Sequence, residues 1–402
     1  MSGLSRNFCY IYIALWMMYY LQGMLAISGV IAKAILIVLM LISFYAFYHV
    51  NRYYKTGPYI KWLNIMVLVM TIYGLIPIIG GWSIVGSYIQ MPWYNFVSLQ
   101  RLYSSIVPIY VFYFFSLKKQ ITSGNLKYIF LFYLIFCIFN YYQLKHSLSL
   151  TYEVEEVTNN SSFFFIPLIP MLQLVKMRDL WKFLFIIIIV TYIILCMKRG
   201  AILVGSILTF LFLLRNLHIA SRRRLLYLII LSSLLLIITY HFVGQLYENS
   251  DLFQLRVRQT LNGDSSGRDG MYSTYFGYFM NKTTPLEFII GNGANATWVL
   301  LGNYAHNDWL EFAINQGCLG VVMYFIYWAV FVWEWNNFSG PKECKIVVGD
   351  IIIAYFLLTL FSMSFDAMVP ATTLCIGYCL AMNEKAKMLN KIKALKGKRL
   401  SW

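Results

Sequence analysis

Hydrophobic runs long enough to cross a bilayer recur along almost the whole chain of 402 residues. A membrane-spanning helix needs about 20 mostly apolar residues, and a soluble domain has too little interior to bury so many such runs. The composition agrees, because 60% of the residues are hydrophobic and only 12% are charged, whereas ordinary soluble domains carry about 25% charged residues. The sequence therefore predicts an all-α protein, a polytopic bundle of membrane helices that forms a single membrane domain over residues 1–402.

Twelve segments have the length and hydrophobicity of a span or of a short, broken one. With the N-terminus inside, every segment between spans that falls inside carries Lys or Arg, as the positive-inside rule expects. We therefore predict about 12 transmembrane helices, with both termini cytoplasmic. The expected spans are 8–28, 31–50, 59–80, 101–117, 126–144, 163–176, 179–197, 200–215, 225–243, 315–335, 346–367 and 369–383.

The chain has a net charge of +16. In a soluble protein it would suggest nucleic acid, but here the cations fix the orientation of the spans and contact anionic membrane lipids. We expect no nucleic-acid partner. The seven cysteines lie mostly in or beside apolar runs and show neither a disulfide framework nor metal-ligand spacing, so we expect no metal.

The topology makes residues 244–314 a large extracytoplasmic loop, the longest polar stretch in the chain. Long loops in compact proteins tend to be functional. The segments DLFQLRVRQTL and MYSTYFGYFM within it predict short interfacial helices. Three groups of residues that could carry chemistry fall on this outer side of the membrane.

The first group is Lys198-Arg199-Gly200, in the short connection between two predicted spans. Cations on the outer face run against the orientation rule, and a guanidinium offers a planar fork of N–H donors to phosphate oxygens. The alternative is a pair of cations whose charged ends simply reach the membrane surface.

The second group is the run from Ser265 to Asp269, with Arg268 as a further phosphate-binding candidate and Gly267 allowing close backbone approach. The same run also fits a helix start, with Ser265 or Ser266 as the cap and Asp269 in the first turn. Both interpretations are compatible with one another.

The third group is Gly291-Asn292-Gly293 followed by the segment around His306. A Gly-x-Gly pair most often marks a turn. His306 precedes a predicted inward span, and an imidazole titrates near neutral pH, so it could accept a hydroxyl proton. Asp308 or Glu311 could orient this imidazole. A purely structural histidine remains the alternative.

These groups, taken in order, resemble the O-antigen ligase and polymerase superfamily over roughly residues 195–325. Lys198-Arg199-Gly200-Ala201 looks like its Ser-Arg-Gly element, with Lys198 in place of the usual small residue. Gly267-Arg268, Pro285-Leu286 and Gly291-x-Gly293 resemble its large extracytoplasmic loop. His306-Asn307-x-x-Leu310-Glu311, followed by Gly317-x-x-Gly320, resembles its histidine signature.

The resemblance implies a metal-independent, cofactor-free membrane glycosyltransferase of the GT-C-like kind. Such an enzyme moves a glycan from undecaprenyl diphosphate to an acceptor hydroxyl at the periplasmic face of the bacterial inner membrane. Carried onto this chain, Arg199 and Arg268 hold the diphosphate and His306 assists the attacking hydroxyl, which favours inversion. The remaining expected substrate-binding residues are Lys198, Gly267, Gly291, Gly293, Asn307 and Glu311.

Three functions remain open. A polymerase would use another lipid-linked repeat as acceptor, with a chain-length regulator protein as a further conceivable partner, and this is the function we favour on the abundance of polymerases. An O-antigen ligase would use the lipid A-core instead. A transporter or flippase of lipid-linked sugars would suit twelve spans, but we find no inverted repeat and few charges within the spans.

Overall fold

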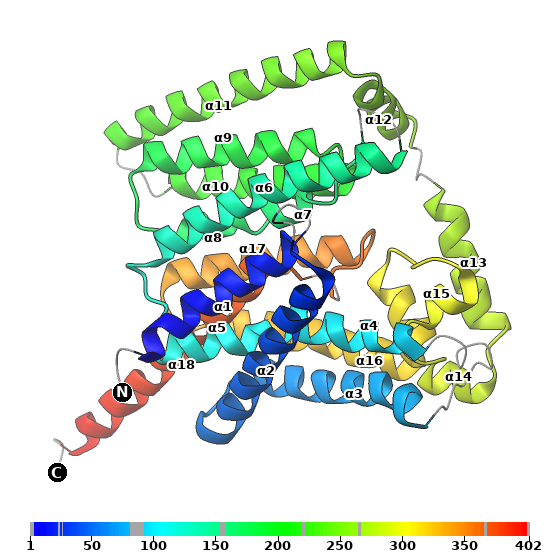
Figure 1. Ribbon diagram of the computed structural model, residues 1–402. Coiled ribbons are helices and arrows are strands. Elements are labelled where there is room, and N and C mark those ends of the chain that lie inside the picture. Colours follow the sequence, from blue (N-terminus) through cyan, green and yellow to red (C-terminus); the bar gives the residue numbers. More distant parts are fainter. Residues whose placement is uncertain are drawn as a thin grey trace. The chain divides into compact units, whose positions relative to one another are not determined.

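The computed structural model describes residues 4–399, apart from 23–24, 26, 81–91, 153–156, 219–221, 264–266 and 366–367. In this part of the chain every regular element is a helix (Figure 1), so the all-α prediction is confirmed. The helices are α1 (Leu4–Tyr20), α2 (Gly29–Tyr53), α3 (Pro58–Gly80), α4 (Pro92–Arg101), η2 (Leu102–Ile106), α5 (Pro108–Leu117), α6 (Leu126–Tyr152), α7 (Ser162–Phe165), α8 (Leu168–Leu174), α9 (Asp179–Leu195), α10 (Arg199–His218), α11 (Arg222–Asn249), α12 (Asp251–Leu261), α13 (Arg268–Asn281), α14 (Pro285–Ile290), α15 (Ala296–Leu301), α16 (Asp308–Asn336), α17 (Lys342–Thr359) and α18 (Pro370–Arg399).

The chain forms two compact units. Unit 1 comprises residues 1–36 and 121–266, and unit 2 comprises residues 37–120 and 267–402. The chain passes from one unit to the other within α2. Because two compact units can share one membrane domain, the single domain over residues 1–402 stays a prediction, as does the extracytoplasmic location of 244–314.

Six of the described helices are long and apolar enough to cross a membrane, which gives the protein the character of a helical membrane protein. Helix also covers each of the other predicted spans, but in pieces that are shorter or less apolar. The number twelve therefore stays a prediction. The six segments are Gly29–Tyr53, Pro58–Leu75, Leu126–Thr151, Arg199–Asn216, Leu226–Asn249 and Asp308–Asn336.

Prolines explain two breaks in the predicted spans. The expected span 163–176 is divided at Pro167, where α7 ends and α8 begins. The expected span 101–117 contains the π-helical turn η2 directly before Pro108, with the Val107 N–H donating to the Leu102 carbonyl. A proline has no N–H and its ring crowds the carbonyl four residues earlier, so the preceding turn widens.

The core of unit 2 is built around α5, α16, α17 and α18. Helix α18 packs tightly against α5 because Gly377 has no side chain, and a Cβ there would lie 2.6 Å from the Ile109 carbonyl oxygen. The short helices α13, α14 and α15 gather beside the first turns of α16, as Figure 1 shows. Every site residue that the sequence predicted between 267 and 311 belongs to this unit.

Candidate functional site

The backbone around His306 is unusual and firmly held. His306 is exposed and has φ of 49°, in the left-handed region that residues other than glycine seldom adopt. On one side, the Ala305 N–H donates to Glu311 at 2.6 Å. On the other, Asn307 is the N-cap of α16, and its side-chain oxygen accepts from the Trp309 N–H at 2.9 Å. The residues on either side of His306 are therefore fixed to the start of α16.

Glu311 holds three segments together from a position that is only 7% exposed. Besides the Ala305 N–H, it accepts a hydrogen bond from the Thr297 hydroxyl at 2.6 Å and another from the Asn315 amide at 3.1 Å. A buried carboxylate is stable only when such donors replace water. The predicted substrate-binding residue Glu311 thus has a positioning role for the His306 segment, and direct contact with substrate stays a prediction.

Asp308 has a comparable role in the first turn of α16. Its carboxylate accepts hydrogen bonds from the Ser364 N–H and hydroxyl, the Phe365 N–H and the Tyr324 hydroxyl, over 2.6–3.2 Å. It therefore ties the helix start to the segment that follows α17. A negative charge in a first turn is also favoured by the helix dipole.

Tyr272 ties α13, the helix that Arg268 begins, to the His306 segment. The Tyr272 hydroxyl lies 3.2 Å from the His306 carbonyl oxygen and 3.2 Å from the Leu360 carbonyl oxygen. Arg268 is four residues earlier on α13 and therefore on the same helix face. Burial raises the pKa of Tyr272, and the nearby charge of Arg268 opposes this shift. The sequence analysis missed Tyr272, although its spacing from Arg268 was a usable signal.

Arg268 is the first residue of α13, and Gly267 is the N-cap, with φ of 74°. The guanidinium is partly exposed, and within the described residues it has no ion pair. Asp269 lies in the first turn, so the helix start predicted for this run is confirmed. The expected cap was wrong, because the N-cap is Gly267 and not Ser265 or Ser266, and these two serines lie outside the described residues.

Gly291 and Gly293 belong to a segment that is hydrogen-bonded to a kink in α16. Gly317 interrupts this helix with φ of 68° and ψ of −162°, which releases carbonyl groups of the preceding turn. The Asn292 N–H donates to the Ile314 carbonyl and the Gly293 N–H to the Asn315 carbonyl, both at 2.9 Å. Gly291 thus has a packing role, and a contact of Gly291 or Gly293 with substrate stays a prediction.

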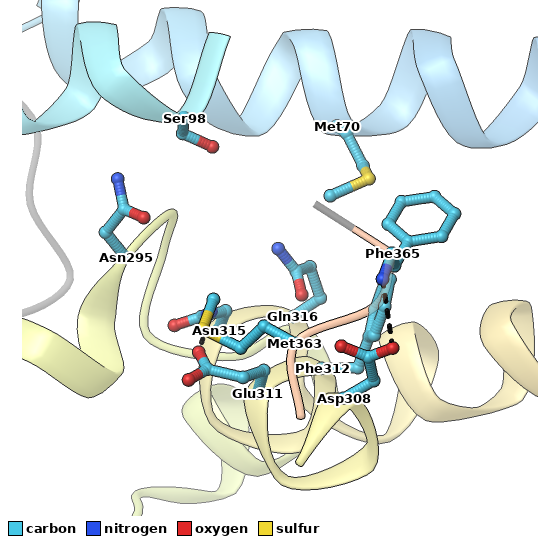
Figure 2. Close-up of a pocket in the computed structure, with 10 residues that line it drawn as sticks. All are labelled: Met70, Ser98, Asn295, Asp308, Glu311, Phe312, Asn315, Gln316, Met363 and Phe365. Carbon is cyan, nitrogen blue, oxygen red and sulfur yellow. Dashed lines mark hydrogen bonds between the residues drawn. The ribbon is translucent and has the colours of Figure 1, made fainter. Parts of the chain in front are cut away.

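A small polar cavity lies beside these groups (Figure 2). It has about 20 Å³ of free space, which is room for about one water molecule and far less than a sugar ring needs. The cavity is therefore too small to hold a sugar ring. Its lining residues are Met70, Ser98, Asn295, Asp308, Glu311, Phe312, Asn315, Gln316, Met363 and Phe365.

Lys198 and Arg199 belong to unit 1, whereas Arg268 and His306 belong to unit 2. Arg199 is partly exposed and begins α10, two residues after Met197, which has φ of 52°. Met197 is buried with Phe253 of α12. The start of a helix is electropositive because of its backbone N–H groups. The side chain of Arg199 adds a second positive charge at the start of α10. The convergence of Arg199 with Arg268 and His306 stays a prediction.

The described residues contain no group of three or more His, Cys, Asp or Glu side chains placed to hold a metal ion. No protein-family model matches the sequence, and no curated protein matches it either. Within the described part of unit 2, the arrangement consists of His306 on a fixed backbone, Tyr272 bonded to its carbonyl oxygen, and Arg268 one turn from Tyr272 and without an ion pair.

Proposed function

We propose that this protein is a membrane glycosyltransferase that lengthens glycans carried on undecaprenyl diphosphate. The observation that carries the proposal is the hydrogen bond from Tyr272 of α13 to the His306 carbonyl, which ties the helix that Arg268 begins to the His306 segment. Within the described residues Arg268 has no ion pair, and such an arginine is suited to a phosphate group. An exposed imidazole is suited to accept a proton from an incoming hydroxyl.

The reaction would proceed as a single displacement. The acceptor hydroxyl loses its proton to the His306 imidazole, and its oxygen forms a bond to the anomeric carbon. The bond from that carbon to the diphosphate oxygen breaks, and the electron pair leaves with undecaprenyl diphosphate. Arg268 stabilises the developing negative charge, which is the kind of electrostatic help that lowers such barriers most. Attack opposite the leaving group inverts the anomeric configuration.

The proposed site would lie on the outer side of the membrane. Twelve spans with both termini in the cytoplasm would put α12 to α15 on the periplasmic side of the bacterial inner membrane, in a GT-C-like architecture. The diphosphate of a polyprenyl carrier lies at the same level, because its charge stays at the interface while its tail remains in lipid. Arg199, at the start of α10 in unit 1, is the second phosphate-binding candidate of the proposal.

The test is glycan synthesis by the purified full-length protein in liposomes, supplied with undecaprenyl-diphosphate-linked repeats. We expect longer lipid-linked glycans. Products that form only when lipid A-core is added would identify a ligase instead. Movement of substrate across the liposome without any product would identify a transporter and refute the proposal.

Two variants test the assigned roles. His306→Asn is preferable to alanine because asparagine tolerates the left-handed backbone, and we expect it to lower the rate about 10²- to 10⁴-fold. Arg268→Ala should lower the rate about 10²- to 10³-fold. Lys282→Ala is the matched control, because Lys282 is an exposed cation at the other end of α13, about 21 Å along the helix at 1.5 Å per residue. Full activity in either site variant would contradict the role given to that residue.

A further inference from the structure

We infer that Arg101, at the end of α4, binds an oxyanion of the substrate beside the His306 segment. The inference rests on the proposed function and adds to it a residue from a distant part of the chain. It starts from one contact, the stacking of the Arg101 guanidinium over the ring of Tyr304, with the guanidinium carbon 4.7 Å from the ring centre. Tyr304 lies two residues before His306.

The contact holds the guanidinium of Arg101 over the Tyr304 ring. Tyr304 is itself packed against Trp298 of α15, with 5.1 Å between the ring centres. A guanidinium over an aromatic ring still has N–H groups that can form hydrogen bonds. Arg101 is therefore positioned beside the His306 segment before any ligand arrives, which reduces the entropy lost on binding.

The donors of Arg101 are also available. Within the described residues its guanidinium has neither a hydrogen bond nor an ion pair, and the residue is only partly buried. A cation used only for structure would be expected to find a carboxylate or a carbonyl at such a site. Within the described residues Arg268 also has no ion pair, and its helix is bonded to the same segment through Tyr272.

Two further contacts hold α3 and α4 at this position. The Tyr73 hydroxyl of α3 donates to the Ile290 carbonyl at the end of α14, at 2.6 Å. Ser98, one turn before Arg101 on α4, lines the same cavity as Asn295 and Glu311 (Figure 2). The location of Arg101 thus follows from the packing of both helices and does not depend on its own side chain alone.

The ligand that Arg101 would bind is a planar or tetrahedral oxyanion. It could be the diphosphate of the carrier lipid or the carboxylate of an acidic sugar in the glycan, and both match a guanidinium fork. The competing explanation is a cation that only anchors α4 at the membrane surface through Tyr304. Binding measurements separate these possibilities.

The experiment uses the full-length protein in nanodiscs of zwitterionic lipid and two probes, undecaprenyl diphosphate without sugar and a soluble oligosaccharide that contains glucuronate. We expect Arg101→Ala to weaken binding of one of them about 10- to 100-fold and Arg101→Lys to weaken it less. Tyr304→Phe keeps the ring and should bind as the parent protein does. Lys282→Ala is the control for loss of one positive charge.

The result identifies the source of the oxyanion. A loss confined to undecaprenyl diphosphate assigns Arg101 to the carrier, and a loss confined to the oligosaccharide assigns it to an acidic sugar. Unchanged binding in Arg101→Ala, or no binding of either probe by the parent protein, would overturn the inference. If the parent protein binds a probe through Arg101 but makes no glycan, the proposed function fails while this inference survives.

Discussion

At the scale of single residues, the left-handed backbone of His306 is the feature with the clearest consequence. Such a conformation costs of the order of 1–3 kcal/mol and persists only where the surroundings impose it. Here the surroundings are the Glu311 carboxylate on Ala305 and the Asn307 cap of α16. The imidazole therefore projects from a backbone that the protein holds at a cost, as is common where a side chain must be aimed.

The link between Tyr272 and His306 gives a prediction at this scale. Tyr272→Phe removes the hydroxyl that reaches the His306 and Leu360 carbonyl groups. A net hydrogen bond contributes about 1 kcal/mol, so we expect glycan synthesis to fall roughly 5-fold with little change in folded yield. The rate of chain elongation in liposomes measures the effect.

Tyr278→Phe serves as its control, because Tyr278 lies on the same helix and its hydroxyl has no such contact with the His306 segment. Equal losses in both variants would show that the hydroxyl of Tyr272 has no special role.

At the scale of elements, the kink in α16 joins two parts of the site. Carbonyl groups released at Gly317 accept the N–H groups of Asn292 and Gly293. A Cβ on Gly317 would meet the Gly291 nitrogen and the Ile289 carbonyl oxygen, both at 2.5 Å. Backbone atoms cannot move aside as a flexible side chain can, so the kink and the segment before α15 depend on one another.

We therefore expect Gly317→Ala to destabilise the protein by several kcal/mol, from overpacking and from the positive φ together. Thermal unfolding in detergent measures this change, monitored as the loss of the monodisperse peak in size-exclusion chromatography. Gly277→Ala is the contrasting variant, since Gly277 is helical and has open space around it. It should stabilise the protein by about 1 kcal/mol. If Gly317→Ala left the stability unchanged, the kink in α16 and the segment before α15 would not depend on one another.

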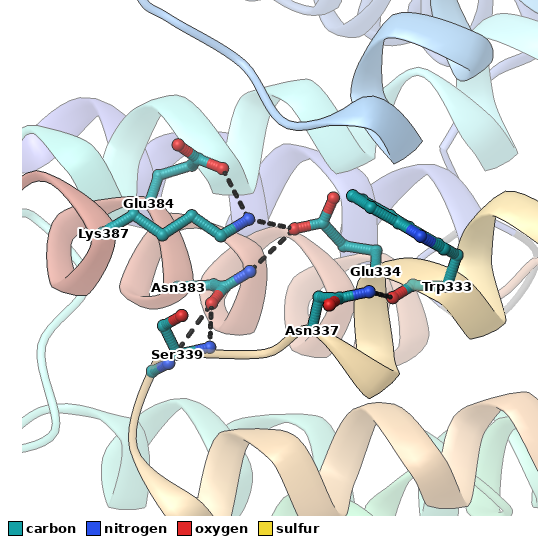
Figure 3. A network of polar contacts seen from close by, with 8 residues as sticks. Trp333, Glu334, Asn337, Ser339, Asn383, Glu384 and Lys387 are labelled. Atoms are coloured by element: carbon teal, nitrogen blue, oxygen red, sulfur yellow. Dashed lines mark hydrogen bonds and ion pairs between the residues drawn. The ribbon is translucent and has the colours of Figure 1, made fainter.

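A buried network joins the other end of α16 to α18 (Figure 3). Lys387 lies 2.6 Å from Glu334, whose side chain is only 2% exposed, and 3.4 Å from Glu384. Asn383 donates to the same Glu334 oxygen at 2.8 Å and accepts the Ser339 N–H at 2.7 Å. The network connects α16, the loop after it, and α18.

Removal of the lysine should be costly, because it leaves a buried carboxylate without its counter-charge. We expect Lys387→Ala to lower the free energy of unfolding by about 3 kcal/mol, the low end of the range for buried pairs, since Lys387 is itself 30% exposed. Lys391→Ala, four residues on and exposed, should change it by less than about 0.5 kcal/mol. Chemical denaturation in mild detergent compares the two, and similar values would contradict the prediction.

At the scale of the whole molecule, the distribution of positive charge predicts the orientation in the membrane. Residues 118–125 should face the cytoplasm and Lys282 the periplasm. In a Cys318→Ser background the other native cysteines are buried. A membrane-impermeant maleimide should then label Lys282→Cys, but not Gly124→Cys, in intact cells whose outer membrane has been made permeable. Labelling of Gly124→Cys alone would reverse the orientation and place His306 in the cytosol.

The sequence by itself determined the helical class, six of the apolar spans and the helices α12 and α13, because each depends on residues close together in the chain. Hydrophobic run length, helix caps and prolines act locally. It also pointed to His306 and Arg268, through the chemistry of their side chains and through a family resemblance.

Only the tertiary structure decided which distant residues meet. Tyr73 and Ile290 are 217 positions apart, and neither carries a signal that pairs them. The contact of Arg101 with Tyr304, the link from Tyr272 to His306 and the match between Gly317 and Gly291 are of the same kind. Such pairs arise when whole helices pack and satisfy one another's buried polar groups, and that depends on three-dimensional shape, which local sequence patterns do not encode.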